Sequence, residues 1–407
     1  MKPSLLPIFD KAEFLFIEQP FPAYLKELSG YRRDFKAALN FLYAYKDIRM
    51  TYDAYRREIE RFLHWSWQVA KKSILNLKPA DIEAYIKFCQ RPRSTWIGLF
   101  KQHRFMVDIQ GERIPNPRWR PFVATVSKSE FRKGAKPKIS DFDFSNNSVK
   151  ELFAILSSFY RYLLQEEYVK TNPITLIRQK SKFIRKSQGQ PKIRRLSELQ
   201  WQYVIKTAEE LATKDPDKHN RTLFVLSVLY SMYLRISELV TSKRWVPKMN
   251  DFATDADGNW WFTTVGKGNK ERKIAVSESM LKALKHWRKS LNLSALPSPN
   301  DNFPLLPKTK GKGPITSTNS IRKIVQYCFD LAIEKLNKDG FKEEADTLNA
   351  ATVHWLRHTG ISDDVKHRPR EHVRDDAGHS SSAITDKYID VELKARHRSA
   401  KNKLIVI

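Results

Sequence analysis

The sequence predicts a mainly α-helical protein with one small antiparallel β-sheet, divided into a helical domain and a second domain of α+β type. Three observations support this fold class. Apolar residues recur at helical spacing along most of the chain. Residues 257–276 instead carry the signals of a β-hairpin. The 407 residues are too many for one comfortable core, and the hydrophobic fraction of 41% suffices for folded globular structure.

Helical spacing begins after residue 34, so residues 1–34 are interpreted as an N-terminal extension. Thr51 is expected to cap a helix, and Pro79 is expected to begin another, since proline suits the first helical position. The apolar faces of these helices are predicted to hold Tyr55, Ile59, Phe62, Ile82, Tyr85 and Ile86.

Residues 91–147 change character, with several prolines and the basic run FRKGAKPK. We interpret them as a loop-rich insertion with one helix near Ile97–Val107. Helical spacing then returns in residues 148–169 and ends before Pro173, because a residue preceding proline tends to leave the helix. The apolar stripe of this helix is predicted to comprise Leu152, Ile155, Leu156, Phe159 and Leu163. Residues 35–178 are therefore expected to form one helical domain.

Residues 179–195 are basic and contain Gly189 and Pro191, which marks them as the interdomain linker. A flexible basic strap would suit a protein that closes around a DNA duplex. An ordinary solvated loop explains the same composition equally well, and both interpretations remain open.

The second domain opens with a clear helix start. Ser197 and Gln200 form a capping box, and Leu196 and Trp201 form a hydrophobic staple. A further apolar helix is predicted over about 222–234. The segments WWFTTV and RKIAV then flank a Gly-Lys-Gly-Asn-Lys turn, which predicts two strands of a three-stranded sheet. Ser277 is expected to cap the next helix, and helices continue from about Ser317.

The chain carries 73 Lys and Arg against 45 Asp and Glu, a net charge of +28. A charge of this size attracts polyanions, with nucleic acid foremost. The two cysteines, Cys89 and Cys328, are too few for a disulfide framework or a cysteine-rich zinc site and are expected to be small core residues. The N-terminus is not a signal peptide, and no apolar stretch reaches membrane-spanning length, so a cytoplasmic protein is expected.

Four separated clusters carry the residues suited to chemistry. They are LYSMYLRISEL with Arg235 and Glu238, GKGNKER with Lys267 and Lys270, HWLRHTG with His354 and Arg357, and AGHSSSAITDKYID with His379 and Tyr388. Each cluster alone is weak evidence. An Arg beside an i+3 Glu is usually a surface ion pair, and a GKG without a following helix is not a phosphate-binding P-loop.

Together and in this order, the four clusters resemble the tyrosine recombinase (phage integrase) family, whose pattern reads roughly GLRxSEL, GKGxKxR, HxLRHT and LGHxxxxTxxxY. The resemblance covers about residues 190–395, and residues 35–180 resemble the family's helical core-binding domain more loosely. There are three departures from the pattern. Met232-Tyr233 replaces Thr-Gly, Gly360 stands where a bulky residue is usual, and Ala377 replaces Leu. None of these departures removes a reacting group.

The resemblance implies a helical core-DNA-binding domain over 35–178, an α+β catalytic domain over 196–395 and a C-terminal tail over 396–407. By the same resemblance Tyr388 is the nucleophile and Arg235 and Arg357 grip the phosphate. His354 accepts the tyrosine proton, His379 bonds a phosphate oxygen, and Lys267 protonates the departing 5′-oxygen. The resemblance assigns support of the site to Glu238 and His358. Contacts to DNA phosphates are expected from Lys270, Arg272 and Lys273.

The implied activity is that of a site-specific DNA recombinase or integrase acting on a mobile genetic element. It cleaves and rejoins DNA through a 3′-phosphotyrosyl intermediate, without ATP, metal or any other cofactor. The expected partners are double-stranded DNA, further copies of the chain (two per site, four in the synapse) and accessory DNA-bending proteins, but no membrane. The apolar end Leu404–Ile407 is expected to dock on a neighbouring copy, with folding back on its own domain as the alternative.

Three alternatives were weighed against this function. A type IB topoisomerase uses similar chemistry, but the separate helical domain and the residues after Tyr388 favour a recombinase. A catalytically silent DNA-binding factor would not need the intact polar set. A metal-dependent transposase would need converging carboxylates, whereas Asp363-Asp364 and Asp375-Asp376 are adjacent pairs that we interpret as solvated or capping groups.

Overall fold

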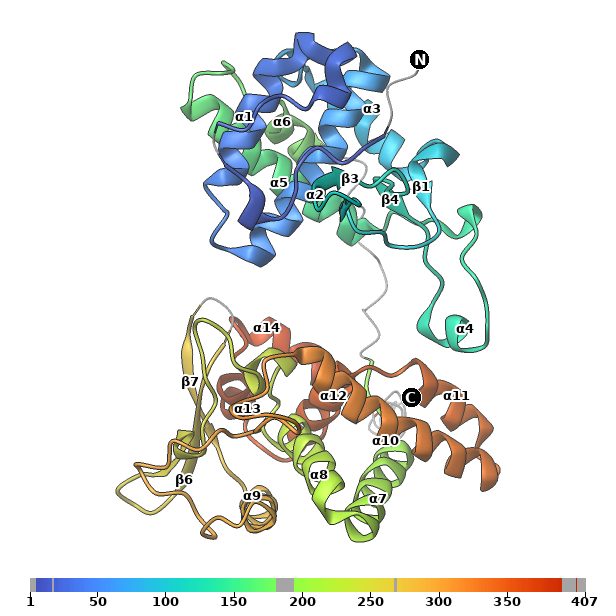
Figure 1. Cartoon of the computed structure of the whole chain (residues 1–407). Coiled ribbons are helices and arrows are strands. Elements are labelled where there is room, and N and C mark those ends of the chain that lie inside the picture. Colours follow the sequence, from blue (N-terminus) through green and yellow to red (C-terminus); the bar gives the residue numbers. More distant parts are fainter. Residues whose placement is uncertain (1–4, 17, 181–193, 267–268, 390–399, 401–407) are drawn as a thin grey trace, which may run out of the picture. The chain divides into compact units, whose positions relative to one another are not determined.

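The computed structural model describes residues 5–16, 18–180, 194–266, 269–389 and 400 (Figure 1). Contacts between residues divide the chain into two compact units, Met1–Gln190 and Pro191–Ile407. Most of the predicted linker and nearly all of the predicted tail lie outside the described residues. Within the described part, no helix is long and apolar enough to cross a bilayer.

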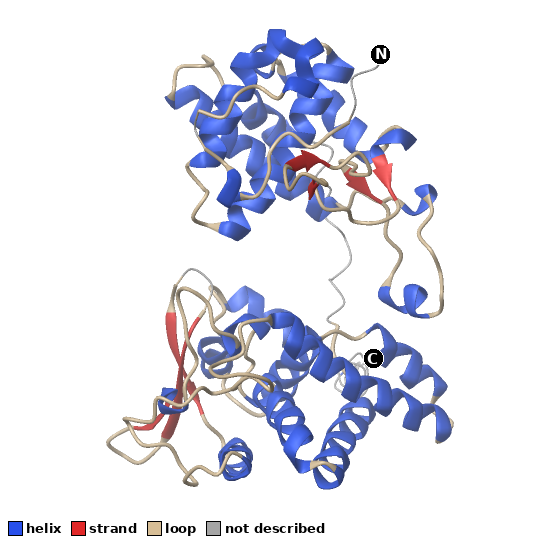
Figure 2. Cartoon of the chain, viewed as in Figure 1, coloured by secondary structure: helices blue, strands red, loops and turns tan. Residues whose placement is uncertain are grey.

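The N-terminal unit is built mainly from helices, shown in blue in Figure 2. Its α-helices are α1 (Arg32–Tyr43), α2 (Arg49–Trp65), α3 (Pro79–Gln90), α4 (Lys128–Arg132), α5 (Asn146–Gln165) and α6 (Pro173–Lys180). The predicted helix beginning at Pro79 is confirmed, and so is the buried stripe of α5. Thr51 is not a cap, because α2 begins at Arg49. The fully buried Tyr52 donates a hydrogen bond to the carbonyl of Asp10 at 2.7 Å. Packing therefore fixes the first turn of this helix, which begins two residues before Thr51.

Short helical turns join these helices. They are η1 (Ala12–Phe14), η2 (Ala23–Tyr31), the π-helical η3 (Ser66–Ala70), η4 (Ile74–Asn76), η5 (Ser94–Trp96) and η6 (Ile139–Asp141). The helix expected before Pro173 ends at Gln165, and Pro173 itself begins α6.

The insertion over 91–147 contains strands where a helix was predicted. Strand β1 (Ile97–Gly98) pairs in parallel with β4 (Phe122–Val123), and β2 (Phe105–Val107) pairs antiparallel with β3 (Arg113–Pro115). The predicted helix near Ile97–Val107 is therefore wrong. Gly98 weakens a helix, and Ile97 gains a pairing partner 25 residues later along the chain, which a local pattern does not reveal.

The C-terminal unit packs helices around a second core, with a small sheet at one side (Figure 1). Its α-helices are α7 (Glu198–Lys214), α8 (Pro216–Ser231), α9 (Glu278–Ser290), α10 (Thr318–Lys338), α11 (Lys342–Ala350), α12 (Val353–Asp364), α13 (Arg370–Ala377) and α14 (Ser382–Thr385). Its short turns are η7 (Ile236–Leu239), η8 (Met249–Asp251) and η9 (Asp386–Ile389). The capping box of Ser197 and the cap of Ser277 are both confirmed.

The sheet of this unit has the order β5-β6-β7 and is antiparallel throughout, with strands β5 (Phe252–Thr254), β6 (Trp260–Val265) and β7 (Glu271–Ala275). Phe262 pairs with Phe252 on one side and with Ile274 on the other, so the central strand carries the buried face. The predicted mainly α fold with a small antiparallel sheet is confirmed. Cys89 and Cys328 are buried thiols, each in the core of its own unit.

Candidate active site

Three segments of the C-terminal unit converge on the predicted chemical residues. Helix α8 ends at Ser231, and the chain then turns so that Arg235 precedes η7. Helix α12 carries His354, Arg357 and His358, while η9 follows α13 and α14 and carries Tyr388. Lys267 lies outside the described residues.

Arg357 is the most enclosed of these side chains, with 2% of its surface exposed. Its guanidinium donates to the carbonyl oxygen of Tyr233 and, at 2.5 Å, to that of Ala377. A guanidinium has five N–H donors, so two bonds to carbonyls orient the group and leave donors for a ligand. Burial, with the charge of Arg235 next, lowers the pKa of Arg357 to about 9, which still leaves it charged at neutral pH.

Glu238 lies between two further arginines and is 2% exposed. Its carboxylate accepts from Arg235 Nη1 at 3.0 Å, and from Arg272 Nη1 at 2.9 Å and Nη2 at 2.8 Å. Burial opposes the charge of Glu238, but Arg272 and Arg235 outweigh it and hold the pKa below its ordinary value. The supporting role predicted for Glu238 thus has a physical basis, since one carboxylate orients two guanidinium groups.

Arg272 was expected to contact DNA phosphates, and in the structure its side chain is engaged within the protein. Its side chain is 10% exposed, binds Glu238 through both terminal nitrogens, and donates from Nε to the carbonyl of Asp376 at 3.0 Å. Alternation along β7 turns Arg272 inward while Lys273 remains exposed. Lys270 is exposed as well. Arg272 therefore links β7 to Glu238 and to α13, and phosphate contact by Arg272 and the two lysines stays a prediction.

Gly378 follows α13 and brings the backbone close to Arg272. Its φ of +62° is left-handed, and a Cβ there would lie 2.9 Å from Arg272 Cδ. The Gly378 carbonyl accepts from Arg235 Nη2 at 3.4 Å. Glycine is therefore needed both for the turn and for the approach to the arginines.

Tyr388 points its hydroxyl at the Nδ1 atom of His358, with which it forms a short hydrogen bond. His354 was expected to accept the proton of this tyrosine and His358 to play a supporting part. In the structure His358 contacts the hydroxyl, whereas His354 is exposed and contacts the ring of His358, with ring centroids 4.2 Å apart. Two residues four apart on one helix share a face, so the motif pattern alone does not decide which one reaches the hydroxyl.

His379 lies on the other side of the tyrosine. Its ring stacks on that of Tyr388, with centroids 5.7 Å apart and an interplanar angle of 17°. Its Nδ1 atom bonds the buried hydroxyl of Thr385 at 2.9 Å, which fixes the ring and leaves Nε2 for another partner. Thr385 was not among the predicted residues, although it belongs to the same motif.

The groups around Tyr388 carry a net positive charge, which favours the binding of an anion. Three guanidiniums, those of Arg235, Arg272 and Arg357, face the one carboxylate of Glu238. Burial raises the pKa of Tyr388, and the fields of Arg357 and Arg235 oppose that rise. Burial also lowers the pKa of His358 to about 4, helped by the charges of neighbouring His354 and Arg357. A neutral imidazole next to a protonated phenol can accept its proton as the phenol attacks.

The acidic pairs of α12 and α13 are not all the solvated or capping groups that the sequence suggested. Asp364 accepts from the phenol of Tyr233, and the 5%-exposed Asp376 accepts from Arg368 Nη2 at 2.5 Å. Among the described residues there is no group of three or more His, Cys, Asp or Glu side chains that could hold a metal ion.

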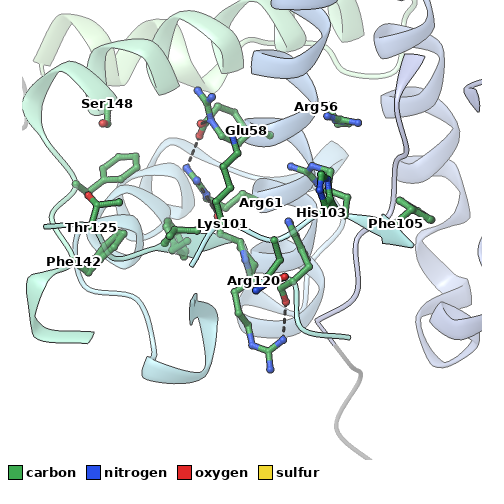
Figure 3. A pocket seen from close by; sticks show the side chains of 18 of the residues that line it. Arg56, Glu58, Arg61, Lys101, His103, Phe105, Arg120, Thr125, Phe142 and Ser148 are labelled. Atoms are coloured by element: carbon green, nitrogen blue, oxygen red, sulfur yellow. Dashed lines mark hydrogen bonds and ion pairs between the residues drawn. The ribbon is translucent and has the colours of Figure 1, made fainter. Parts of the chain in front are cut away.

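A cavity of about 630 Å³ lies in the N-terminal unit, between α2 and the insertion (Figure 3). None of the predicted site residues lines it. Its arginines are largely paired within the unit, as Arg61 with Glu58 at 2.8 Å and Arg113 with Asp10 at 2.5 Å. The cavity is therefore framed by ion pairs that tie the insertion to the N-terminal segment and to α2.

Comparison with known proteins identifies the C-terminal half. Residues 194–394 match the phage integrase family model. Tyrosine recombinase XerC of Leptospira interrogans is 26% identical over 263 residues, covering 63% of this chain and 73% of the relative. Tyrosine recombinase XerD of Bradyrhizobium diazoefficiens is 29% identical over 147 residues, covering 35% of this chain and 42% of the relative.

The crystal structure of the XerH site-specific recombinase bound to palindromic difH substrate, a post-cleavage complex, has a similar fold. The TM-score is 0.53 at 14% sequence identity, and the match covers 99% of each chain. At this identity the likeness concerns the fold, while the family model and the sequence relatives concern ancestry. The matched residues include every described member of the arginine, histidine and tyrosine cluster. Residues 194–394 therefore form a domain of the phage integrase family, and the relatives that match this chain in sequence are tyrosine recombinases.

Proposed function

We propose that this protein is a site-specific DNA recombinase that cleaves and rejoins duplex DNA through a covalent bond to Tyr388. One observation carries the proposal. The Tyr388 hydroxyl lies on the imidazole of His358, within the field of Arg357 and Arg235. A nucleophile, a base and two anion-binding groups are thereby assembled from one chain.

In the cleavage step the Tyr388 oxygen attacks the scissile phosphorus and its proton passes to His358. A bond forms between phosphorus and the phenolic oxygen, and the bond from phosphorus to the 5′-oxygen breaks. Arg235 and Arg357 bind the non-bridging oxygens and stabilise the charge of the pentacoordinate transition state. His379 donates a further hydrogen bond from Nε2. The product is a 3′-phosphotyrosyl link and a free 5′-hydroxyl.

The departing 5′-oxygen needs a proton, and we assign Lys267 as its donor. This assignment rests on the place of Lys267 in the GKG turn between β6 and β7. The phosphotyrosyl bond conserves the energy of the phosphodiester, so rejoining proceeds by the reverse attack of a 5′-hydroxyl. The proposed chemistry therefore uses neither ATP nor a metal ion.

Two copies of the chain on each site and four in the synapse follow from an exchange of four strands. The palindromic substrate of the XerH complex agrees with such symmetry for that protein. Accessory DNA-bending proteins remain an expectation. The net charge of +28 supports tight, salt-dependent binding to the duplex.

A type IB topoisomerase, the alternative enzyme, is not favoured, because the sequence relatives are recombinases. A silent DNA-binding factor is not favoured either, because the described reacting groups are present and converge.

The deciding experiment first selects bound sequences from a random DNA pool and then places two copies of the selected site on one supercoiled plasmid. Incubation in EDTA should yield recombinant circles or inversions, resolved by restriction mapping. Relaxed plasmid without exchange would favour the topoisomerase, and a strict Mg²⁺ requirement for strand cleavage would contradict the proposed mechanism.

A further inference from the structure

A second polar cluster lies next to the arginines of the site. It consists of Tyr233, Asp364, Arg368 and Asp376, and it is called the Tyr233 cluster below. The phenol of Tyr233 donates to Asp364 and accepts from Arg368 Nη1 at 3.0 Å. Arg368 also binds Asp364 at 3.2 Å and Asp376 at 2.5 Å. The cluster thus joins the chain after α8 to both α12 and α13.

Tyr233 adopts a backbone conformation that residues other than glycine rarely adopt. Its φ is +51°, in the left-handed region, where a residue with a Cβ is strained. The ring is fully buried and packs in a small apolar cluster that also contains Tyr388. The hydrogen bonds of the phenol and the burial of the ring together offset the conformational free-energy cost of this left-handed turn.

This turn determines where Arg357 points. The carbonyl of Tyr233 accepts from Arg357 Nη1, and the carbonyl of Ala377, next to Asp376, accepts from Nη2. Both acceptors of the Arg357 guanidinium therefore belong to segments that the Tyr233 cluster holds. A rotation of the turn at Tyr233 would remove one of these two carbonyl acceptors from Arg357.

Gly360 makes room for this arrangement. A Cβ at position 360 would lie 2.0 Å from the carbonyl oxygen of Tyr230 and 3.2 Å from Tyr233 Cδ1. Two of the positions that depart from the family pattern, a large residue at 233 and a small one at 360, are thus neighbours in space. The tyrosine ring and the close approach of α12 to α8 each depend on the absence of a side chain at Gly360.

We propose that Tyr233 is a positioning residue for cleavage: its phenol, bound to Asp364 and Arg368, holds the left-handed turn whose carbonyl orients Arg357 toward the scissile phosphate. This inference rests on the proposed function and adds to it a residue of the first motif to which the family pattern assigns no part in the chemistry. Tyr233 does not touch DNA in this scheme and acts only through Arg357.

The test compares the wild type with Tyr233→Phe, which removes the hydroxyl and keeps the ring. Cleavage is followed in single turnover on a nicked suicide substrate carrying the selected site. We expect Tyr233→Phe to form the covalent complex about tenfold more slowly, because a small displacement of a phosphate-binding group is costly for catalysis. Binding to the uncleaved duplex should change less than twofold.

A second substrate separates positioning from general loosening. A methylphosphonate at the scissile position lacks the charged oxygen that Arg357 stabilises. The defect of Tyr233→Phe should therefore shrink to less than about twofold on this substrate, and Arg357→Ala should show the same pattern with a larger defect on phosphate. Equal slowing of Tyr233→Phe on both substrates, or no slowing on either, would overturn the inference.

Tyr230→Phe is the matched control. Tyr230 lies in the last turn of α8 and its phenol donates to Asp363 at 3.0 Å, but none of its bonds reaches Arg357. This variant should cleave like the wild type on both substrates, and a defect equal to that of Tyr233→Phe would contradict the assignment. The wild-type measurement distinguishes failure of the proposed function from failure of the role proposed for Tyr233. A wild-type protein that forms no covalent complex would refute the proposed function itself.

Discussion

Glu238 shows how one buried carboxylate can organise an anion-binding site. Its single negative charge is shared by Arg235 and Arg272, so these three groups keep one positive charge, and Arg357, which donates to two carbonyls, adds a second. Loss of the carboxylate would leave two guanidiniums close together without compensation. Removing one partner of a buried ion pair is strongly destabilising, whatever the net contribution of the intact pair.

Glu238→Gln should lower the free energy of unfolding by about 3 kcal/mol at neutral pH and slow cleavage. The difference from the wild type should shrink at acidic pH. The pKa of Glu238 is depressed in the folded state, so its contribution is present at neutral pH and is lost as the pH falls through that depressed value. Urea unfolding at several pH values measures both effects.

Glu210→Gln provides the comparison, because the ion pair of Glu210 with Lys335 lies at the surface, with side chains 41% and 35% exposed. Its effect should stay within about 0.5 kcal/mol. Equal destabilisation by the two variants would show that the surroundings of Glu238 are not special.

We expect His358, and not His354, to accept the proton of Tyr388 during cleavage. His358→Gln is expected to slow covalent-complex formation by about 100-fold, and His354→Gln by less, since general-base catalysis commonly contributes that much. Because the pKa of His358 is lowered to about 4, the acidic fall of kcat/KM in the free enzyme should lie well below pH 6. A larger defect in His354→Gln, or an acidic limb near pH 6.5, would restore the assignment made from the motif.

At the residue scale, the sequence could predict which residue types meet but not all of their contacts. Arg235, Arg357, His379 and Tyr388 converge as the motifs indicated. The pairing of Arg272 with Glu238 was not predicted, because Arg272 stands in a hairpin within a basic run and Glu238 lies 34 residues away. The Tyr233 cluster was not predicted, because its charged members Asp364, Arg368 and Asp376 resemble ordinary surface residues in the sequence. Their contacts with Tyr233 and with one another form only when the helices pack.

At the element scale, the packing of α12 against α8 depends on Gly360. Gly360→Ala should lower the melting temperature of the C-terminal unit, because the new Cβ would collide with a backbone carbonyl that cannot give way cheaply. We expect destabilisation of about 2 kcal/mol or more. Gly30→Ala is the control, since Gly30 has nothing within 4 Å of a Cβ and no positive φ. Calorimetry that finds the two variants alike would contradict this packing.

In the sequence, Lys267 stands between strands β6 and β7. Lys267→Ala should slow cleavage strongly on an ordinary substrate. Replacing the bridging 5′-oxygen by sulfur should restore most of the rate, since a thiolate leaves without protonation. Single-turnover rates on the two substrates give the answer, and equal slowing on both would show that Lys267 only binds DNA.

Element types were predictable where a single pattern extended over many residues, as in α5, or where caps were explicit, as at Ser197 and Ser277. The insertion was not predictable in the same way. Its two small sheets have strands of two or three residues, too short for a periodic signal. It is held instead by contacts distant in sequence, such as the pairing of Arg104 with the buried Glu60 of α2.

At the scale of the whole molecule, the family match covers residues 194–394, and the N-terminal unit lies outside it. The insertion combines twelve Lys and Arg with five Asp and Glu, in keeping with the basic character of the chain. What Leu404–Ile407 contact stays a prediction, because these residues lie outside the described part. Their removal should reduce cooperative assembly on a full site more than binding to a half site.

The central claim is that Tyr388 becomes covalently joined to DNA. The most direct measurement traps the complex on a nicked suicide substrate of the selected site in EDTA, digests the protein and identifies the DNA-linked peptide by mass spectrometry. We expect the 3′-phosphate to be attached to Tyr388, and we expect Tyr388→Phe to bind the same site without forming an adduct. An adduct on any other residue, or undiminished cleavage by Tyr388→Phe, would contradict the central claim.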